Sequence, residues 1–183
     1  MPQTLTHRLA TSADIPALGA LMNAAIAELQ RGFLTPVQIT ASRLFMGIDS
    51  QLIDDGTYFI IEAGDGGLPQ IAGSGGWSRR ATLYGGDHTP DRNAALLDPA
   101  TEAARVRAMY TAPEFARRGV GRMILGLCEA AASAEGYRRV ELVGTMSGEP
   151  LYRACGYEVI ERFEDGRGGT PVPLARMGKA LAP

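Results

Sequence analysis

Apolar residues recur with two different periods along the first third of the chain. An alternating pattern over residues 5–9 predicts a short strand. Apolar residues then follow at helical spacing and predict a helix over about residues 13–29, after side-chain oxygens that are suited to cap it. Thr35 followed by Pro36 has the pattern of a helix start, so a second helix is expected to run to about residue 50.

The next segment has the pattern of an antiparallel hairpin. Residues 58–63 and 71–77 are rich in strand formers, and the glycine-rich residues 64–67 are suited to connect them. Three glycines in the second strand suggest a bend or the close approach of another chain or a ligand. Residues 78–102 have few apolar positions, and long segments of this kind are usually functional or disordered. Their place in the chain would let them fold over a substrate site.

The central pattern is a strand, a tight turn and a helix. The alternation over residues 106–111 predicts a strand. One face of this strand would carry Val106, Ala108 and Tyr110, and the other face Arg107, Met109 and Thr111. An apolar stripe from Val120 predicts a helix that ends near Gly136, and residues 139–144 predict another strand. This order implies a parallel crossover, with ligands expected at the carboxyl ends of the strands.

The last part of the chain predicts a short helix from about Pro150 to Gly156 and strands over residues 157–163 and 172–177. A length of 183 residues suits one domain with a sizeable core, so a single domain over residues 1–183 is expected. Its class is α/β with a mixed sheet, in which antiparallel N-terminal strands precede a parallel β-α-β unit.

Composition excludes several classes of protein. The 18 Lys and Arg against 20 Asp and Glu give a net charge of −2, so nucleic acid is not expected as a partner. Cys128 and Cys155 occupy apolar positions without metal-ligand spacing, so we expect reduced thiols and no metal. No apolar run approaches a membrane span and the N-terminus has no apolar signal core, so we expect a cytoplasmic protein without a membrane partner.

The turn before Val120 offers anion binding. Backbone N–H groups at a helix N-terminus are unpaired, and glycines let a phosphate come close to them. The pattern is not a P-loop, because no Gly-Lys-Ser/Thr follows, and it is not the dinucleotide fingerprint, because Ile124 stands at the third glycine position. An ordinary glycine-rich turn is the alternative. The candidate phosphate-binding residues are Arg117, Arg118, Gly119, Val120, Gly121 and Arg122.

Residues 110–122, Tyr-Thr-Ala-Pro-Glu-Phe-Ala-Arg-Arg-Gly-Val-Gly-Arg, resemble the acyl-CoA-binding motif of the GNAT superfamily of N-acetyltransferases. Gly119 and Gly121 stand at the two glycine positions, and Ala116 replaces the usual Gln or Arg. Residues 151–157, Leu-Tyr-Arg-Ala-Cys-Gly-Tyr, resemble a second signature of that family, without the asparagine often found upstream. The two signatures come in the family's order, so the resemblance implies a GNAT-like fold over nearly the whole chain.

The resemblance implies an N-acetyltransferase that uses acetyl-CoA (coenzyme A) as cosubstrate and a small-molecule or peptide amine as acceptor. In the family the amine attacks the thioester directly. Backbone amides near Met109, Tyr110 and Thr111 would hold the pantetheine arm and polarise the carbonyl, and Tyr152 would protonate the CoA thiolate. Dimers are common in the family, so a homodimer is one expected assembly.

The general base stays open. Glu141, on the strand beside the expected cleft, and Glu28, on the first helix, are the candidates, although such carboxylates are more often solvated or ion-paired. His88 is more often a solvated loop histidine, and an apolar helix position does not lower the thiol pKa of Cys155. Two other functions also stay open, a non-catalytic module that binds or senses acyl-CoA and an unrelated phosphate-binding α/β protein.

Overall fold

The computed structural model describes residues 4–64 and 67–182. Within them, seven strands form one sheet in the order β1-β2-β3-β4-β5-β7-β6, in which only β4 and β5 are parallel neighbours. This topology confirms the predicted α/β class with antiparallel N-terminal strands and a parallel β-α-β unit. The strands are β1 (Thr4–Leu9), β2 (Tyr58–Gly64), β3 (Gln70–Ser78), β4 (Ala104–Thr111), β5 (Arg139–Thr145), β6 (Glu158–Asp165) and β7 (Val172–Ala180).

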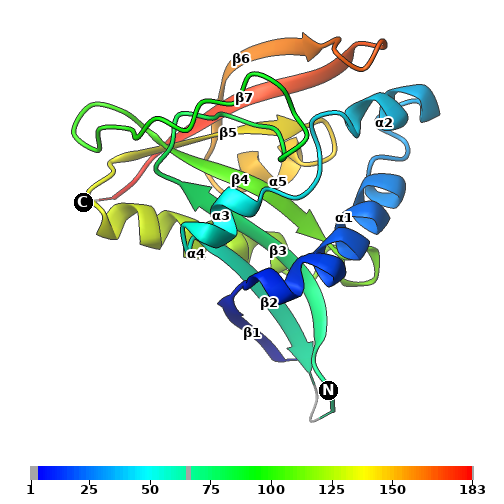
Figure 1. The fold of residues 1–183 in the computed structure, drawn as a ribbon, viewed down its shortest axis with the longest axis horizontal. Helices are drawn as coiled ribbons and strands as arrows, with labels where there is room; N and C mark the ends of the chain where they lie inside the picture. The colour runs from blue at the N-terminus through cyan, green and yellow to red at the C-terminus, as the bar shows by residue number, and fades with distance from the viewer. Residues whose placement is uncertain (1–3, 65–66, 183) are drawn as a thin grey trace.

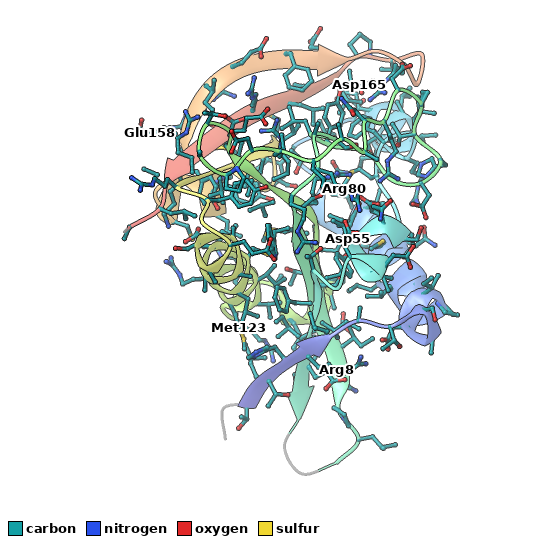
Figure 2. The ribbon with its side chains drawn as sticks, turned by 60° about the vertical axis from the view of Figure 1, so that its left-hand side comes forward. Arg8, Asp55, Arg80, Met123, Glu158 and Asp165 are labelled. Atoms are coloured by element: carbon teal, nitrogen blue, oxygen red, sulfur yellow. The ribbon has the colours of Figure 1, made fainter. Side chains whose placement is uncertain are left out.

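Helices cover both faces of this sheet (Figure 1). Figure 2 shows α4 on one side of the central strands and the first three helices on the other. Two single 3-10 turns, η1 (Ser12–Asp14) and η2 (Pro113–Phe115), precede α1 and α4. The helices are α1 (Ile15–Leu29), α2 (Pro36–Ser42), α3 (Ser50–Asp54), α4 (Val120–Ala134) and α5 (Glu149–Ala154).

Helix α4 packs closely on the sheet because β3 has little side-chain volume beneath it. A Cβ atom on Gly73 would lie 2.5 Å from the Val120 side chain, and one on Gly75 would lie 2.5 Å from Ile124. Such short contacts are sterically forbidden, so these two positions need glycine for the helix to approach. The glycines of β3 therefore serve the close approach of another part of the chain, which was one of the alternatives left open by the sequence.

The second predicted helix is wrong in its extent. Instead of one helix that runs to residue 50, α2 ends at Ser42 and α3 begins at Ser50. Between them Gly47 adopts a φ of 149°, which favours glycine, and its N–H donates to the Tyr110 hydroxyl at 2.9 Å. Residues 43–49 thus form a connection that is bonded to β4 instead of a further turn of helix.

The other predicted elements are present, with shifts at their ends. The last strand continues to Ala180 instead of stopping near residue 177, and the strand before it continues to Asp165. Gly136 has a φ of 93° just after α4, as expected of a helix C-terminal cap. Asp65 and Gly66, which belong to the expected hairpin connection, lie outside the described residues. Residues 79–103 contain no helix or named strand in the described chain.

Candidate functional site

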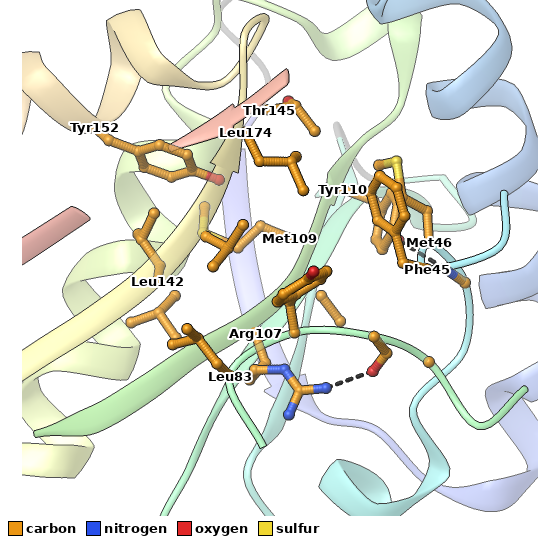
Figure 3. Close-up of a pocket in the computed structure, with 17 residues that line it drawn as sticks. Phe45, Met46, Leu83, Arg107, Met109, Tyr110, Leu142, Thr145, Tyr152 and Leu174 are labelled. Atoms are coloured by element: carbon orange, nitrogen blue, oxygen red, sulfur yellow. Dashed lines mark hydrogen bonds between the residues drawn. The ribbon is translucent and has the colours of Figure 1, made fainter. Parts of the chain in front are cut away.

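A cleft opens where β4 and β5 separate. These strands pair only through Ala104 with Val140 and Arg105 with Glu141, although both continue for several residues. The β5-facing backbone groups of β4 after this point therefore have no strand partner. The opening holds a cavity of about 100 Å³ (Figure 3). It lies towards the carboxyl ends of both strands, which is where ligands bind in open α/β sheets.

Leu174 of β7 and three further segments also line the cleft. Residues 45–47 come from the connection between α2 and α3, and Tyr152 comes from α5. Residues 83–86 come from the long segment between β3 and β4. This segment therefore lies over the cleft, as its place in the sequence suggested.

An extra residue in β4 determines which side chains reach the cleft. The register of β3 against β4 shifts near position 75, and Ala108 in this bulge has a φ of 51°. The Tyr58 hydroxyl donates to the Ala108 carbonyl at 2.7 Å and holds the bulge in place. The alternation predicted for this strand is consequently wrong, because Arg107 and Tyr110 both bond to the segment between α2 and α3.

Arg107 joins the sheet to the segment that lies over the cleft. Its Nη2 donates to Asp49 at 2.7 Å and to the Gly85 carbonyl, and its Nη1 donates to the Thr82 carbonyl at 3.0 Å. Asp49 also accepts from Arg92 at 2.6 Å. Burial lowers the pKa of the Arg107 guanidinium, which nevertheless stays charged because its ordinary value is so high. One boundary of the cleft is thus the buried ion pair of Arg107 and Asp49.

Tyr152 reaches the cleft from the other side (Figure 3). Its ring lies against two glycines, since a Cβ atom on Gly144 or on Gly148 would come within 2.9 Å of it. Burial raises the pKa of the Tyr152 phenol to about 12, so the hydroxyl is protonated at neutral pH and can donate. The sequence named this tyrosine, and the structure brings it to the cleft beside β4.

The hydroxyl of Tyr152 differs from the other three that line the cleft. Tyr110 accepts from the Gly47 N–H at 2.9 Å, Tyr84 donates to Asp165 at 2.9 Å, and the Thr145 hydroxyl is 3.1 Å from that of Ser147. The Tyr152 hydroxyl makes no hydrogen bond with any described residue. Among these groups it alone has its full hydrogen-bonding capacity available to a ligand.

The turn before α4 has the backbone expected of an anion site. Gly119 has a φ of 87° at the N-cap, and Arg117 has a φ of 65°. Within the described chain, the N–H groups of Val120, Gly121 and Arg122 have no partner inside the helix, because they belong to its first turn. The three arginines of this turn are exposed. The turn can therefore offer several N–H donors and positive charge to a phosphate.

Gly119 and Gly121 are each required to be glycine, but for different structural reasons. Space around Gly119 is open, so its backbone conformation is what requires glycine. A Cβ atom on Gly121 would lie 2.5 Å from the Leu151 side chain, so that glycine admits α5 beside α4. The close packing brings α5, and with it Tyr152, next to the N-terminal turn of α4.

Neither candidate for the general base lies in the cleft. Glu141 is bound at the closed end, where its Oε2 accepts from Arg105 at 3.0 Å and from Arg176 at 2.6 Å. Glu141 is not among the residues that line the cleft, and its catalytic role stays a prediction. Glu28 is exposed and pairs with Arg31 at 3.1 Å. His88 lies outside the lining, with its Nε2 2.7 Å from the Arg43 carbonyl.

Asp49 and Leu83 contribute to the site, but the sequence analysis missed both of them. Asp49 falls within the region that was attributed to one long helix. Leu83 is one of the few apolar residues in a segment that has neither the helical nor the strand spacing of apolar positions. A glycine at position 47 before an isolated aspartate was the available sign that the helix stops there. The charge of Arg107 in an otherwise apolar strand was the sign of a buried ion pair.

Among the described residues, no group of three or more His, Cys, Asp or Glu side chains has an arrangement that could hold a metal ion. No helix in residues 4–64 and 67–182 has the length and apolar character needed to span a membrane.

Residues 54–159 match the family model described as an acetyltransferase (GNAT) domain. No curated protein matches the chain in sequence. The matched residues run from the last residue of α3 to the second residue of β6 and include the cleft strands, the turn before α4 and Tyr152.

Solved structures share the fold at low sequence identity. A GCN5-related N-acetyltransferase from Rhodopseudomonas palustris has a TM-score of 0.69 and 18% identity, over 99% of this chain and 98% of that one. A phosphinothricin acetyltransferase from Sinorhizobium meliloti, in complex with acetyl-CoA, has a TM-score of 0.62 and 20% identity, over 100% and 90% of the two chains. The PaiA N-acetyltransferase from Thermoplasma acidophilum, in complex with coenzyme A, has a TM-score of 0.62 and 13% identity, over 97% and 99%.

Proposed function

The chain belongs to the GNAT family of acetyltransferases, and from this premise we propose that it transfers the acetyl group of acetyl-CoA to a primary amine. The observation that carries the proposal is the Tyr152 hydroxyl, which lines the cleft between the separated strands and has no hydrogen bond to a described residue. A proton donor at this place suits the release of a thiol from a thioester.

The residues around the cleft fit an acyl-CoA molecule in two parts. The turn before α4 would bind the pyrophosphate through backbone N–H groups and the side chains of its arginines. The stretch of β4 that has no partner on its β5 side would hold the pantetheine arm and polarise the thioester carbonyl through its N–H groups. The residues proposed for the pyrophosphate are Arg117, Arg118, Gly119, Val120, Gly121 and Arg122, and those proposed for the arm and carbonyl are Met109, Tyr110 and Thr111.

The proposed reaction needs no covalent enzyme intermediate. Acetyl-CoA supplies the thioester and the leaving thiol. The amine nitrogen forms a bond to the carbonyl carbon, the C–S bond breaks, and Tyr152 donates its proton to the leaving sulfur. The nitrogen loses its surplus proton to water, and Tyr152 regains a proton from water. Because the pKa of Tyr152 is about 12, its proton is in place throughout the neutral range.

The test is release of free CoA thiol from acetyl-CoA in the presence of a broad panel of amines, together with thermal unfolding with and without acetyl-CoA. We expect acetyl-CoA to raise the melting temperature, because a ligand that binds only the folded state stabilises it. We expect thiol release that depends on the amine. Stabilisation by acetyl-CoA without release for any amine would instead favour a non-catalytic acyl-CoA-binding module, and the absence of both would refute the proposal.

A further inference from the structure

Among the described residues, none that lines the cleft has a side chain that could take a proton from an amine or bind its positive charge. No Asp, Glu or His is among the described residues that line it. Its single charged side chain is that of Arg107, which is already compensated by Asp49 at 2.7 Å. The cleft therefore has neither an anionic group for an ammonium nor a free cation for a carboxylate.

Three carboxylates that contact or adjoin lining residues are committed to arginines. Asp49 binds Arg107, and Asp165, which accepts from the lining residue Tyr84, pairs with Arg167 at 2.6 Å. Glu141 pairs with Arg176, also at 2.6 Å. Releasing any of them towards an acceptor would leave a partly or fully buried arginine without its partner, which is costly.

One wall of the cleft is apolar. It is formed by Phe45, Met46, Leu83, Val143 and Leu174, and by the ring of Tyr84, whose hydroxyl points away to Asp165. Phe45 and Leu174 belong to a hydrophobic cluster between α2 and β7 that is separate from the main core. The wall is thus backed by packed apolar side chains, and a charged group placed against it would lose its hydration.

The amine must be neutral when it attacks, and this requirement has a quantitative consequence. An alkyl amine with a pKa of about 10.4 is neutral in roughly one molecule in 2,500 at pH 7, whereas an α-amino group with a pKa of about 7.8 is neutral in roughly one in seven. A cleft without a base cannot correct this difference. It therefore favours amines that lose their proton readily in water.

We infer that the acceptor is a weakly basic primary amine of the α-amino amide type, carried on an uncharged, apolar group. The inference rests on the proposed transferase function. It excludes polyamines, which need anionic side chains, and free amino acids, which need a cation for their carboxylate.

Three compounds with one shared body test the inference: phenylalaninamide, 2-phenylethylamine and phenylalanine, with spermidine as the polycation. The readout is kcat/KM for thiol release at pH 7. We expect phenylalaninamide to exceed each of the others by at least about tenfold, from its larger neutral fraction and its lack of other charge. Equal values within about threefold, or a preference for phenylalanine or spermidine, would overturn the inference while leaving the transferase proposal intact. If none of the amines gave thiol release, both the inference and the transferase proposal would be overturned.

The pH profile gives a second readout. For 2-phenylethylamine, kcat/KM should rise about tenfold per pH unit between pH 6 and 9, whereas for phenylalaninamide it should level off near pH 8, because each follows the pKa of the free amine. A common apparent pKa for both compounds would reveal a base on the enzyme and would contradict the inference.

A matched pair of variants tests the wall itself. Leu83 lies in the covering segment rather than in the main core, so Leu83→Asp and Leu83→Asn can be compared at nearly equal shape. The aspartate should raise the ratio of spermidine to phenylalaninamide turnover at least about tenfold over the asparagine variant, because it adds the missing anion. Equal ratios in the two variants would show that the charge of the wall does not select the acceptor.

Discussion

The guanidinium of Arg107 and the carboxylate of Asp49 are 2.7 Å apart, with side chains that are only 3% and 1% exposed. This pair connects β4 to the N-terminal end of α3, and through Arg92 and the carbonyls of Thr82 and Gly85 it also connects to the segment over the cleft. Removing one charge from such a pair leaves the other buried and uncompensated. We therefore expect Asp49→Asn to lower the free energy of unfolding by about 3 kcal/mol or more.

Urea unfolding followed by the fluorescence of Trp77, the single and fully buried tryptophan, measures this loss. Asp54→Asn is the matched control, because Asp54 lies on the same short helix, is exposed and makes no ion pair with a described residue. It should change stability by less than about 0.5 kcal/mol. An equal decrease in the free energy of unfolding in the two variants would show that the buried ion pair contributes no more to stability than an exposed carboxylate does.

Tyr152→Phe tests the proposed acid. The substitution keeps the ring that packs against Gly144 and Gly148 and removes only the hydroxyl. We expect kcat to fall about 10²- to 10⁴-fold, which is the usual range for a positioned acid or base, while the Kd for acetyl-CoA stays nearly unchanged. Thiol release gives kcat, and isothermal titration calorimetry gives the Kd.

Tyr84→Phe provides the comparison for this variant. Tyr84 lines the same cleft, but its hydroxyl donates to Asp165 at 2.9 Å and points away from the reacting groups. Its loss should cost about 1 kcal/mol of stability and leave kcat within about fivefold of the parent. If Tyr152→Phe turned over as fast as the parent at every pH, the acid role would have to be abandoned.

The sequence predicted the order of most elements, the antiparallel pairing of β2 with β3 and the parallel arrangement of β4 and β5, because these follow from local periods and from the length of the connections. Alternation and helical spacing located the strands and α4, and the glycine positions located the turn at Gly119. Tyr152 was found through a resemblance, and the structure brings it to the cleft. The acceptor and the mechanism stay proposals.

The errors have a common origin in effects that involve distant parts of the chain. The bulge at Ala108 depends on the Tyr58 hydroxyl, fifty residues earlier. Because of the bulge, Arg107 does not lie on the face that the local alternation predicted for it. The break at Gly47 is stabilised by Tyr110 of β4. The ion-pair partners of Glu141, whose catalytic role stays a prediction, likewise come from two other strands. None of these partners could be chosen from a local pattern.

Gly119→Ala should weaken CoA binding more than it lowers stability. A Cβ atom there would meet no other atom, so the variant can fold, but a φ of 87° disfavours alanine by roughly 1 kcal/mol or more. Any relaxation of the turn moves the N–H groups of Val120 and Gly121 that are proposed to hold the pyrophosphate. We expect the Kd for CoA, measured by calorimetry, to rise about tenfold.

Gly126→Ala controls for the change of residue type within the same helix. Gly126 is exposed, has ordinary helical backbone and also has open space around it. Alanine should therefore raise the free energy of unfolding by roughly 0.5–1 kcal/mol and leave the Kd for CoA as it is. Equal effects of the two variants on CoA affinity would remove the N-terminal turn from the proposed site.

Asp165→Asn tests the support of the apolar wall and its dependence on pH. Burial acts to raise the pKa of Asp165, but hydrogen bonds from Arg167 and Tyr84 outweigh it and hold the pKa below the ordinary value. A carboxyl with a lowered pKa in the folded state contributes stability that is complete above the unfolded value of about 3.9 and is lost as the pH falls through the folded value. The variant should therefore be about 1–3 kcal/mol less stable than the parent at pH 7, and this difference should shrink progressively below about pH 4. Urea unfolding of both proteins from pH 7 down to pH 2.5 measures it, and a difference that stayed constant over that range would show that the charge of Asp165 does not hold the wall.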